Sequence, residues 1–152
     1  LEHQIKNLEE CKMKSKLKIY TSYVDKDSLL NFIEQGYLPI FILRKIYNSE
    51  IIGKYTDTAI HIKELAPSNQ LFQERRDNNL DLETYKKRYA IELSKTVDFE
   101  QLITKLEMLA KVSNSRGIIL MGYNKNFNDC HRSVLAEILN KSNLLEYEIK
   151  EI

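Results

Sequence analysis

Residues 117–123 read Gly117-Ile118-Ile119-Leu120-Met121-Gly122-Tyr123 and are apolar almost throughout. A continuous apolar run of this length is typical of a strand that is buried on both faces of a parallel sheet. A short polar loop follows, and Cys130-His131-Arg132 then open a helix with apolar residues at helical spacing, namely Val134, Leu135, Ile138 and Leu139. A strand that passes into an amphipathic helix is the building unit of α/β domains, so this stretch predicts that class.

Three further segments predict strands. Residues 17–24 alternate and are rich in aromatic and β-branched side chains. Residues 37–43 form a second, almost wholly apolar run. Residues 145–152 alternate between apolar and polar side chains and predict a strand that closes the domain.

Capping residues mark helices between the predicted strands. A short polar side chain before an apolar-periodic segment satisfies the free N–H groups at a helix start. Such residues precede four predicted helices and are Asp25 or Asp27, Ser68, Asp81 and Asp98. Gly36 is expected to end the first of these helices. Residues 46–62 lack a clear period and predict either an irregular segment or a short hairpin.

The order of these elements is strand, helix, strand, a mainly helical insert, strand, helix, strand. Because strand–helix–strand connections are right-handed and bring their strands into parallel, we expect an α/β fold with a largely parallel sheet of about four strands, covered by helices. No repeat or linker is visible, so residues 13–152 are expected to form a single domain. Residues 1–12 are expected to be an N-terminal arm or an added remnant.

The composition excludes several classes of protein. Of the 152 residues, 43% are hydrophobic and 30% charged, as in a globular domain rather than a disordered chain. The 23 basic and 22 acidic residues leave a formal charge of +1, so no overall field attracts nucleic acid or an acidic membrane.

The sequence contains no signal peptide, membrane span, cofactor motif or metal-ligand spacing. The two cysteines, Cys11 and Cys130, lie far apart, and a disulfide between them is the alternative to two free thiols. These features predict a cytoplasmic protein without a bound cofactor or metal.

The predicted site lies at the carboxyl ends of the strands, where ligands of α/β proteins bind. Hydroxyl, guanidinium and amide side chains follow the predicted strands at these ends, and the loop before Cys130 begins there too. We therefore expect a pocket lined by Thr21, Ser22, Arg44, Tyr123, Cys130, His131 and Arg132.

Cys130 and His131 are the candidate catalytic residues. At a helix start, the backbone N–H dipoles and the nearby Arg132 favour a thiolate, so Cys130 is a candidate nucleophile. His131 is a candidate general acid or base, although adjacent residues on a helix point in different directions. The alternatives are a small packed thiol for Cys130 and a capping or packing role for His131.

Arg44 and Arg132 are the candidate ligands of an anion, because a guanidinium binds phosphate or carboxylate through paired hydrogen bonds. The alternative is a structural ion pair with an acid such as Asp129 or Glu137. The phosphatase pattern, in which an arginine stands six residues after the cysteine, is absent because that position is Ala136. Simple cysteine-phosphatase chemistry is therefore disfavoured.

Other polar groups have weaker claims to a site. The spacing of Asp57, His61 and Glu64 is generic, so these residues are expected at the surface rather than around a metal. The nine tyrosines are expected in the core or at its rim rather than stacked on bases. Arg75-Arg76 and Lys86-Lys87-Arg88 are expected to be solvated, with local contact to nucleic acid as the alternative.

Five motifs occur in a fixed order along the chain. They are Tyr20-Thr21-Ser22-Tyr23, Ile40-Phe41-Ile42-Leu43-Arg44, Glu64-Leu65-Ala66-Pro67-Ser68, Tyr85-Lys86-Lys87-Arg88-Tyr89, and the apolar strand followed by Cys130-His131-Arg132 and Ala136-Glu137. Together they resemble the uncharacterised family called domain of unknown function 488, over residues 19–140. The resemblance implies that the motif positions are Thr21, Ser22, Arg44, Pro67, Tyr89, Cys130, His131 and Arg132.

Members of that family are small bacterial, archaeal and phage proteins without an established activity, so the resemblance implies a site rather than a reaction. The chain departs from the family at Gly122, where many relatives have a cysteine, and this removes a partner for Cys130. It also lacks a tryptophan that often follows Arg44, which changes the rim of the pocket.

These observations predict a pocket for a phosphate-bearing or other anionic ligand, such as a nucleotide or a nucleic-acid end. If the ligand is turned over, Arg44 and Arg132 hold the anion while Cys130 attacks or His131 transfers a proton. The sequence leaves open whether the protein is an enzyme. The alternative is a non-catalytic phage or bacterial interaction protein that binds a host protein, in which these residues form an internally paired network.

Overall fold

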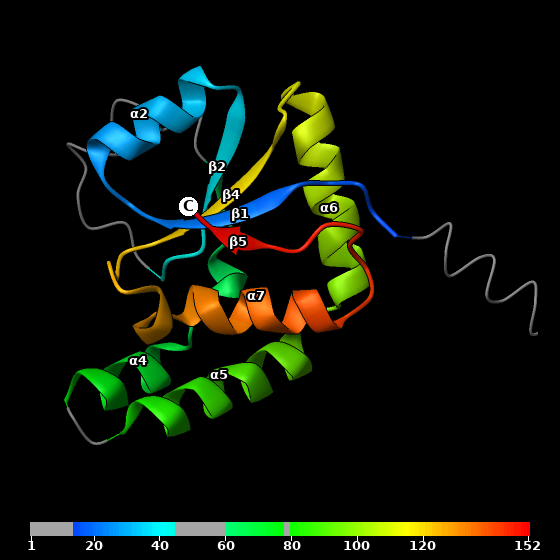
Figure 1. Ribbon diagram of the computed structural model, residues 1–152. Coiled ribbons are helices and arrows are strands. Elements are labelled where there is room, and N and C mark those ends of the chain that lie inside the picture. Colours follow the sequence, from blue (N-terminus) through cyan, green and yellow to red (C-terminus); the bar gives the residue numbers. More distant parts are fainter. Residues whose placement is uncertain (1–13, 45–59, 78–79) are drawn as a thin grey trace, which may run out of the picture.

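The computed structural model describes residues 14–44, 60–77 and 80–152. Within these residues, five parallel strands form one sheet in the order β3-β2-β4-β1-β5 (Figure 1). The strands are β1 (Ile19–Tyr23), β2 (Tyr37–Phe41), β3 (Ile60–His61), β4 (Gly117–Gly122) and β5 (Lys150–Glu151). The predicted α/β class and parallel sheet are confirmed.

Strand β4 lies at the centre of the sheet, and every one of its residues is buried. It pairs with β1 as far as Tyr23↔Gly122 and with β2 as far as Phe41↔Met121. Because the strands are parallel, their carboxyl ends meet at one edge of the sheet. The residues that follow β2 and β4 are thereby brought together.

The helices begin at the residues that the sequence marks as caps. The side chains of Asp25, Ser68, Asp81 and Asp98 each accept a hydrogen bond from a backbone N–H in the first turn. These caps open α2 (Lys26–Glu34), α4 (Asn69–Arg76), α5 (Leu82–Thr96) and α6 (Phe99–Val112), and the remaining helical segments are η1 (Lys63–Leu65), η2 (Phe127–Asp129) and α7 (His131–Lys141). Gly36 follows the first helix at φ +90°, a conformation that side chains disfavour.

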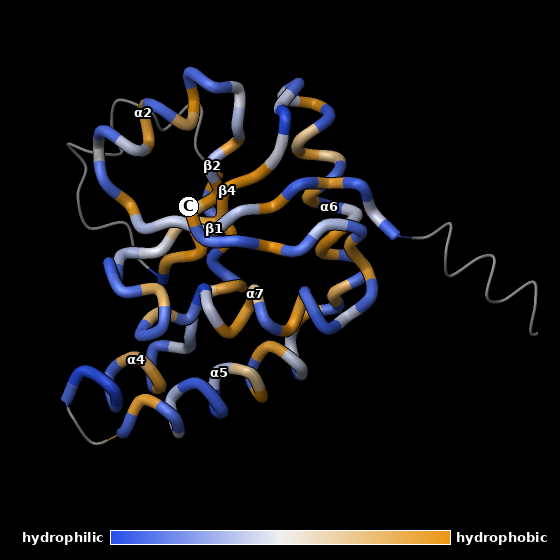
Figure 2. The backbone as a smooth tube through the Cα atoms, in the orientation of Figure 1, coloured by the Kyte–Doolittle hydropathy of each residue, from blue (hydrophilic) through white to orange (hydrophobic). Residues whose placement is uncertain are grey.

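Apolar clusters lie on both faces of the sheet. Phe41, Ile119 and Met121 face one side and pack with residues of α2. Ile40 and Ile118 face the other side and share a cluster with residues of α4, α5, α6 and α7. Figure 2 shows the strands as the apolar interior and polar stretches along the outer helices. Helix α5 packs against α7, so α7 lies between the sheet and the α4–α5 pair (Figure 1).

Strand β5 is shorter than the strand predicted over residues 145–152. Only Lys150–Glu151 pairs with β1, and Leu145 forms an isolated bridge. The Asn140 side chain of α7 binds the backbone of Ile149 instead, accepting from its N–H at 2.7 Å and donating to its carbonyl at 3.2 Å. A helix side chain thus takes the place of a strand partner, which sequence alternation cannot reveal.

The sequence predicted about four strands, and the additional strand in the structure is β3. It lies at the end of residues 46–62, for which the sequence predicted an irregular segment or a hairpin, and it pairs in parallel with β2. The rest of that segment, and the predicted arm at residues 1–12, lie outside the described residues. Among the helices that the structure describes, none is long and apolar enough to cross a membrane.

Candidate functional site

A cavity of about 380 Å³ opens at the carboxyl ends of β2 and β4. Four residues of the predicted pocket line it, namely Arg44 after β2, Tyr123 after β4, and Cys130 and His131 at the start of α7. Helices α4 and α5 complete the wall with Phe72, Arg75 and Tyr85. The cavity is therefore made by segments that are far apart in the sequence.

Cys130 is the residue at which the chain enters α7. Its backbone is extended, at φ −105° and ψ 147°, and its side chain makes no capping hydrogen bond. The thiol lies instead against β4, because a Cβ at Gly122 would be only 2.8 Å from Cys130 Sγ. Cys130 is a free thiol with 3% of its surface exposed, and Cys11 lies outside the described residues. The missing side chain at Gly122 is what makes room for the thiol.

His131 is held with one ring nitrogen toward that thiol. Its Nε2 contacts the Ile42 carbonyl at 2.5 Å, and its Nδ1 lies 3.6 Å from Cys130 Sγ. A carbonyl oxygen only accepts hydrogen bonds, so Nε2 carries the hydrogen and Nδ1 is left to share the proton of the thiol. The Tyr89 ring packs edge-on against the imidazole, with ring centroids 5.5 Å apart. The arrangement is a thiol, an imidazole beside it and a carbonyl group that orients the imidazole.

The surroundings of Cys130 act on its pKa in opposite directions. Burial raises it, whereas the hydrogen bond and charge of His131, followed by the backbone N–H and charge of Arg132, lower it. The net effect lowers the pKa of Cys130 from 9.0 to about 7. A large fraction of the thiol is therefore ionised near neutral pH.

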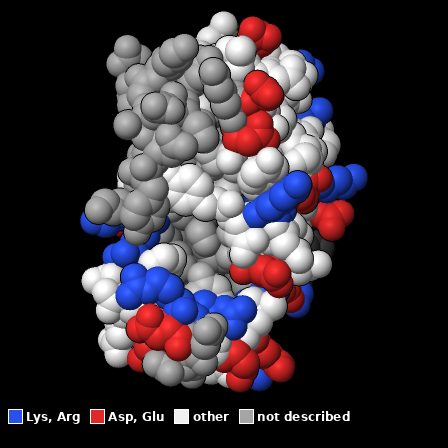
Figure 3. Space-filling view, turned by 90° about the vertical axis from the view of Figure 1, so that its left-hand side faces the viewer, with Lys and Arg blue, Asp and Glu red and all other residues white. Residues whose placement is uncertain are grey.

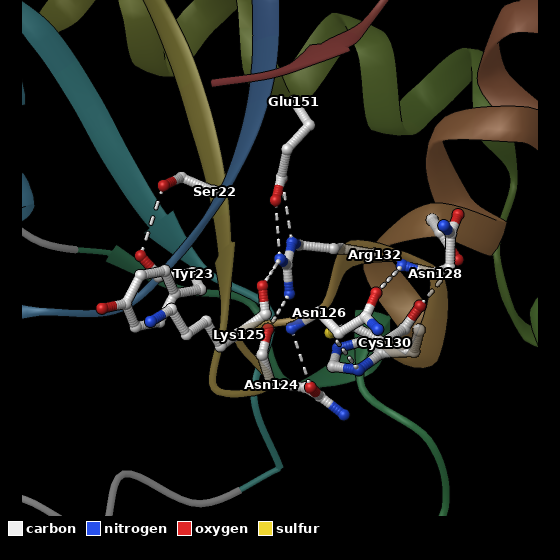
Figure 4. Close-up of polar contacts among 11 residues, drawn as sticks. Ser22, Tyr23, Asn124, Lys125, Asn126, Asn128, Cys130, Arg132 and Glu151 are labelled. Carbon is white, nitrogen blue, oxygen red and sulfur yellow. Dashed lines mark hydrogen bonds and ion pairs between the residues drawn. The ribbon is translucent and has the colours of Figure 1, made fainter.

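Arg132 is fully buried and bound within the fold (Figure 4). Its Nε and Nη2 donate to the two carboxylate oxygens of Glu151 at 3.0 and 2.7 Å, and its Nη1 donates to the Asn124 carbonyl at 2.5 Å. Burial alone lowers the pKa of Arg132, but the hydrogen bond to Glu151 and the negative charges of Cys130 and Glu151 raise it, so the guanidinium stays charged. Arg132 thus ties α7 to β5 and to the loop after β4.

The acid that pairs with Arg132 is not one of the two that the sequence suggests. Glu151 fills this role, whereas Glu137 pairs with Lys141 at 2.8 Å on the exposed side of α7. Asp129 lines the cavity. Strand register alone brings Glu151 to Arg132, because β5 must first pair with β1.

The structure does not place Thr21 or Ser22 on the cavity wall. Thr21 is fully buried beside β5, and its Oγ1 has no hydrogen-bond partner. Ser22 donates to the Tyr23 carbonyl at 3.2 Å and turns away from Cys130 and Arg132 (Figure 4). Alternate residues of a strand face opposite sides of a sheet, so these two neighbours cannot both face α7.

Arg44 is the arginine of the predicted site that faces the cavity. Its guanidinium lies 4.9 Å from the centre of the Phe72 ring, and it makes no hydrogen bond or ion pair within the described part of the chain. Its Nε is buried and without a partner. Arg75 and Arg76 of α4 also border the cavity. Figure 3 shows basic side chains, with acidic ones beside them, on the lower half of the face that it draws.

Two aromatic residues of the cavity were not predicted as site residues. The sequence places Tyr85 in the core or at its rim and makes no separate prediction for Phe72, yet both line the cavity. The Arg44 guanidinium packs against the Phe72 ring, and the Arg75 guanidinium lies 6.0 Å from the centre of the Tyr85 ring. The only available signal was the spacing of Tyr85 and Tyr89, which puts both on one face of a helix.

The candidate metal ligands do not form a site among the described residues. No group of three or more His, Cys, Asp or Glu side chains there could hold a metal. His61 contacts the Leu43 carbonyl through Nε2, and Asp57 lies outside the described residues. In the basic stretch of α5, Lys87 and Arg88 pair with Glu83 and Glu74.

Replacing Gly122 with alanine tests how the thiol is seated. The new methyl group would overlap Cys130 Sγ, so we expect a loss of about 1–3 kcal/mol in the free energy of unfolding and a higher pKa for the displaced thiol. Denaturant unfolding and the pH dependence of alkylation measure the two effects. Gly117→Ala is the control, because its Cβ would meet the Lys18 carbonyl at the other end of β4 and should destabilise the protein without moving the thiol. A Gly122→Ala protein with unchanged stability and thiol pKa would contradict this packing.

Comparison with known families supports the resemblance seen in the sequence. The family model DUF488-N3a, described as the active DUF488-N3 subclade, matches residues 42–143. The match includes Arg44 and the Cys130-His131-Arg132 motif and spans more than half of the 152 residues. No curated protein and no solved structure matches the chain. The chain belongs to the DUF488 family, within its DUF488-N3a subclade.

Proposed function

We propose that this protein binds a phosphate-bearing ligand, such as a nucleotide or a nucleic-acid end, in the cavity after β2 and β4, and that Cys130 acts on it as a nucleophile. The observation that carries the proposal is that Cys130, His131 and Arg44 line one cavity, and that Arg44 Nε is buried without a partner among the described residues. The thiol beside an oriented imidazole is the reactive group, and the guanidinium on the same cavity is the anion ligand.

His131 is the base in this proposal. Its Nδ1 takes the thiol proton, and the Ile42 carbonyl keeps the ring in the required tautomer through Nε2. The imidazolium that forms lies beside the thiolate and stabilises it until the thiolate attacks an electrophilic atom of the ligand. The bond from that atom to its leaving group breaks as the bond to sulfur forms, and the imidazolium gives its proton to the leaving group. Arg132 acts here as a positioning residue, since its donors are bound to Glu151 and to the Asn124 carbonyl.

Arg44 is the anion ligand in this proposal. An internally paired network would use its donors, whereas its Nε is buried without a partner. This favours a ligand site over a purely structural network. The apolar wall beside Arg44, formed by Phe72 and by Leu43 in the segment after β2, suits the less polar part of a nucleotide.

The family description agrees with a chemical role, since it calls the subclade active without naming a reaction. The reaction differs from that of simple cysteine phosphatases, because Ala136 replaces the arginine of their loop. A reactive free thiol is kept reduced in the cytoplasm, where we expect this protein to act.

Arg44→Gln tests the anion site. We expect inorganic phosphate, pyrophosphate or nucleoside monophosphates to raise the melting temperature of the wild type by about 5–10 °C when present at about 100 times their dissociation constant. The variant should lose most of this shift, because glutamine has the amide but not the charge. Thermal denaturation of both proteins against the same compounds gives the comparison.

Arg116→Gln is the matched control for this experiment. Arg116 also stacks on a ring, 5.3 Å from the centre of Tyr37, but it precedes β4 and so lies at the opposite edge of the sheet. Its variant should keep the full ligand-induced shift. If no compound raises the melting temperature, or if Arg44→Gln keeps the wild-type shift, the proposal is wrong and a protein partner becomes the better hypothesis.

A further inference from the structure

Tyr85 of α5 has a buried hydroxyl-bearing side chain that the proposed chemistry does not yet use. Its residue surface is 7% exposed, and it lines the same cavity as Cys130. Its hydroxyl makes no hydrogen bond within the part of the chain that the structure describes. Among the described residues, the buried side-chain polar atoms without a partner are Thr21 Oγ1 and Arg44 Nε, so the Tyr85 hydroxyl is open to the cavity rather than enclosed. A bound ligand would supply the missing acceptor.

Tyr89 follows Tyr85 by one helical turn, and its contacts show that this side of α5 faces His131. Its ring packs against His131, and its hydroxyl donates to the Leu65 carbonyl at 2.5 Å. Residues four apart on a helix share a face, so Tyr85 extends this row of rings by one turn. Figure 1 shows α5 and α7 running side by side with their first turns at the same end, which puts Tyr85 toward the start of α7. Cys130 caps that end of α7.

Burial, with a contribution from a nearby negative charge, keeps the Tyr85 hydroxyl protonated. Burial raises the pKa of Tyr85, and the negative charge of Cys130 raises it further, which outweighs the lowering by Arg75. The hydroxyl is therefore a hydrogen-bond donor throughout the physiological pH range. A donor in a cavity bordered by Arg44 and Arg75 suits an anionic acceptor.

We propose that the Tyr85 hydroxyl donates a hydrogen bond to a phosphate oxygen of the bound ligand and so helps to select phosphate-bearing compounds. This inference rests on the proposed function of the cavity. It adds a neutral donor from α5 to the anion site, which Arg44 borders from the segment after β2. The ligand is thereby held between the sheet edge and the α4–α5 pair.

Tyr85→Phe tests this role, because it removes the hydroxyl and keeps the ring. The variant is made in a Cys11→Ser background, so that Cys130 is the only thiol. The probes are inorganic phosphate and adenosine 5′-monophosphate. The quantity measured is the concentration of each compound that halves the rate of Cys130 alkylation by iodoacetamide. We expect this concentration to rise about tenfold in Tyr85→Phe, with no loss of thermal stability, since no protein hydrogen bond is removed.

Tyr89→Phe is the matched control on the same helix face. It removes a hydroxyl that is paired with the Leu65 carbonyl, so it should lower the melting temperature and leave the half-protecting concentration unchanged. If neither compound slows the alkylation of Cys130 when Tyr85 and Tyr89 are unchanged, the proposed function itself is wrong. Protection of the wild type and of Tyr85→Phe at equal concentrations would overturn only the role of Tyr85. A loss of stability in Tyr85→Phe as large as that in Tyr89→Phe would show that the hydroxyl is structural, and would also overturn it.

Discussion

Replacing His131 with glutamine is expected to raise the pKa of Cys130 from about 7 to 9 or above. The glutamine amide can still donate to the Ile42 carbonyl, but it offers the thiol neither a base nor a positive charge. At pH 7 the thiolate fraction would fall from about one half to about 1%, so the rate of alkylation should fall about 50-fold. The measurement is the pH dependence of alkylation by iodoacetamide in a Cys11→Ser background.

His61→Gln is the control for this variant. His61 also contacts a carbonyl through Nε2, but this carbonyl belongs to Leu43, the residue after the Ile42 that binds His131. It is not among the groups that shift the pKa of Cys130, so its variant should keep the wild-type pH profile. If the His131→Gln protein reacts with the same pH midpoint as the wild type, then His131 does not activate the thiol.

Replacing Arg132 with methionine is expected to destabilise the protein strongly. The change leaves the Glu151 carboxylate without its buried partner and removes the donor to the Asn124 carbonyl. Because the Glu151 side chain is partly exposed, the loss is that of hydrogen bonds to a charged group, about 1.5–3 kcal/mol, which corresponds to a melting temperature lower by about 3–12 °C. Thermal and urea denaturation of wild type and variant measure the loss.

Lys141→Met on the same helix provides the contrast. Its ion pair with Glu137 is exposed on both sides, so we expect a change within about 0.5 kcal/mol. An Arg132→Met protein that unfolds like the wild type, and that loses only its ligand-induced shift, would contradict the positioning role. Such a result would instead support the anion-ligand role that the sequence alone suggests for Arg132.

The fold could be predicted largely from local signals. Four capping residues and the apolar run at residues 117–123 act on their own neighbourhoods, and each produced the element that it predicts. The short edge strands could not be predicted in the same way. β3 and β5 have only two paired residues each, and their pairing depends on the rest of the sheet being in place.

The structure brings some of the candidate site residues together and leaves others apart. Arg44, Tyr123, Cys130 and His131 line one cavity, because the carboxyl ends of β2 and β4 are neighbours. The sequence argument that neighbours on a helix point apart does not apply to Cys130 and His131, since Cys130 is the extended cap and only His131 is helical.

The pairing of Arg132 could not have been found from sequence. Its partner Glu151 lies 19 residues later and reaches it only through the register of β5 with β1. Tyr85 was equally hidden, because a tyrosine at helical spacing looks the same whether its hydroxyl meets the core or a cavity. Distinguishing the two requires the packing of α5 against α7.

Alkylation of Cys130 in the Cys11→Ser protein, followed against pH at increasing concentrations of inorganic phosphate and of adenosine 5′-monophosphate, tests the reactive thiolate and the anion site together. We expect a midpoint near pH 7 and a rate that falls as either compound fills the cavity. Iodoacetate should also react faster, relative to iodoacetamide, than it does with the same thiol in urea, because we propose that the cavity attracts anions. A midpoint at or above pH 9, together with a rate that neither compound changes, would contradict both the reactive thiolate and the anion site.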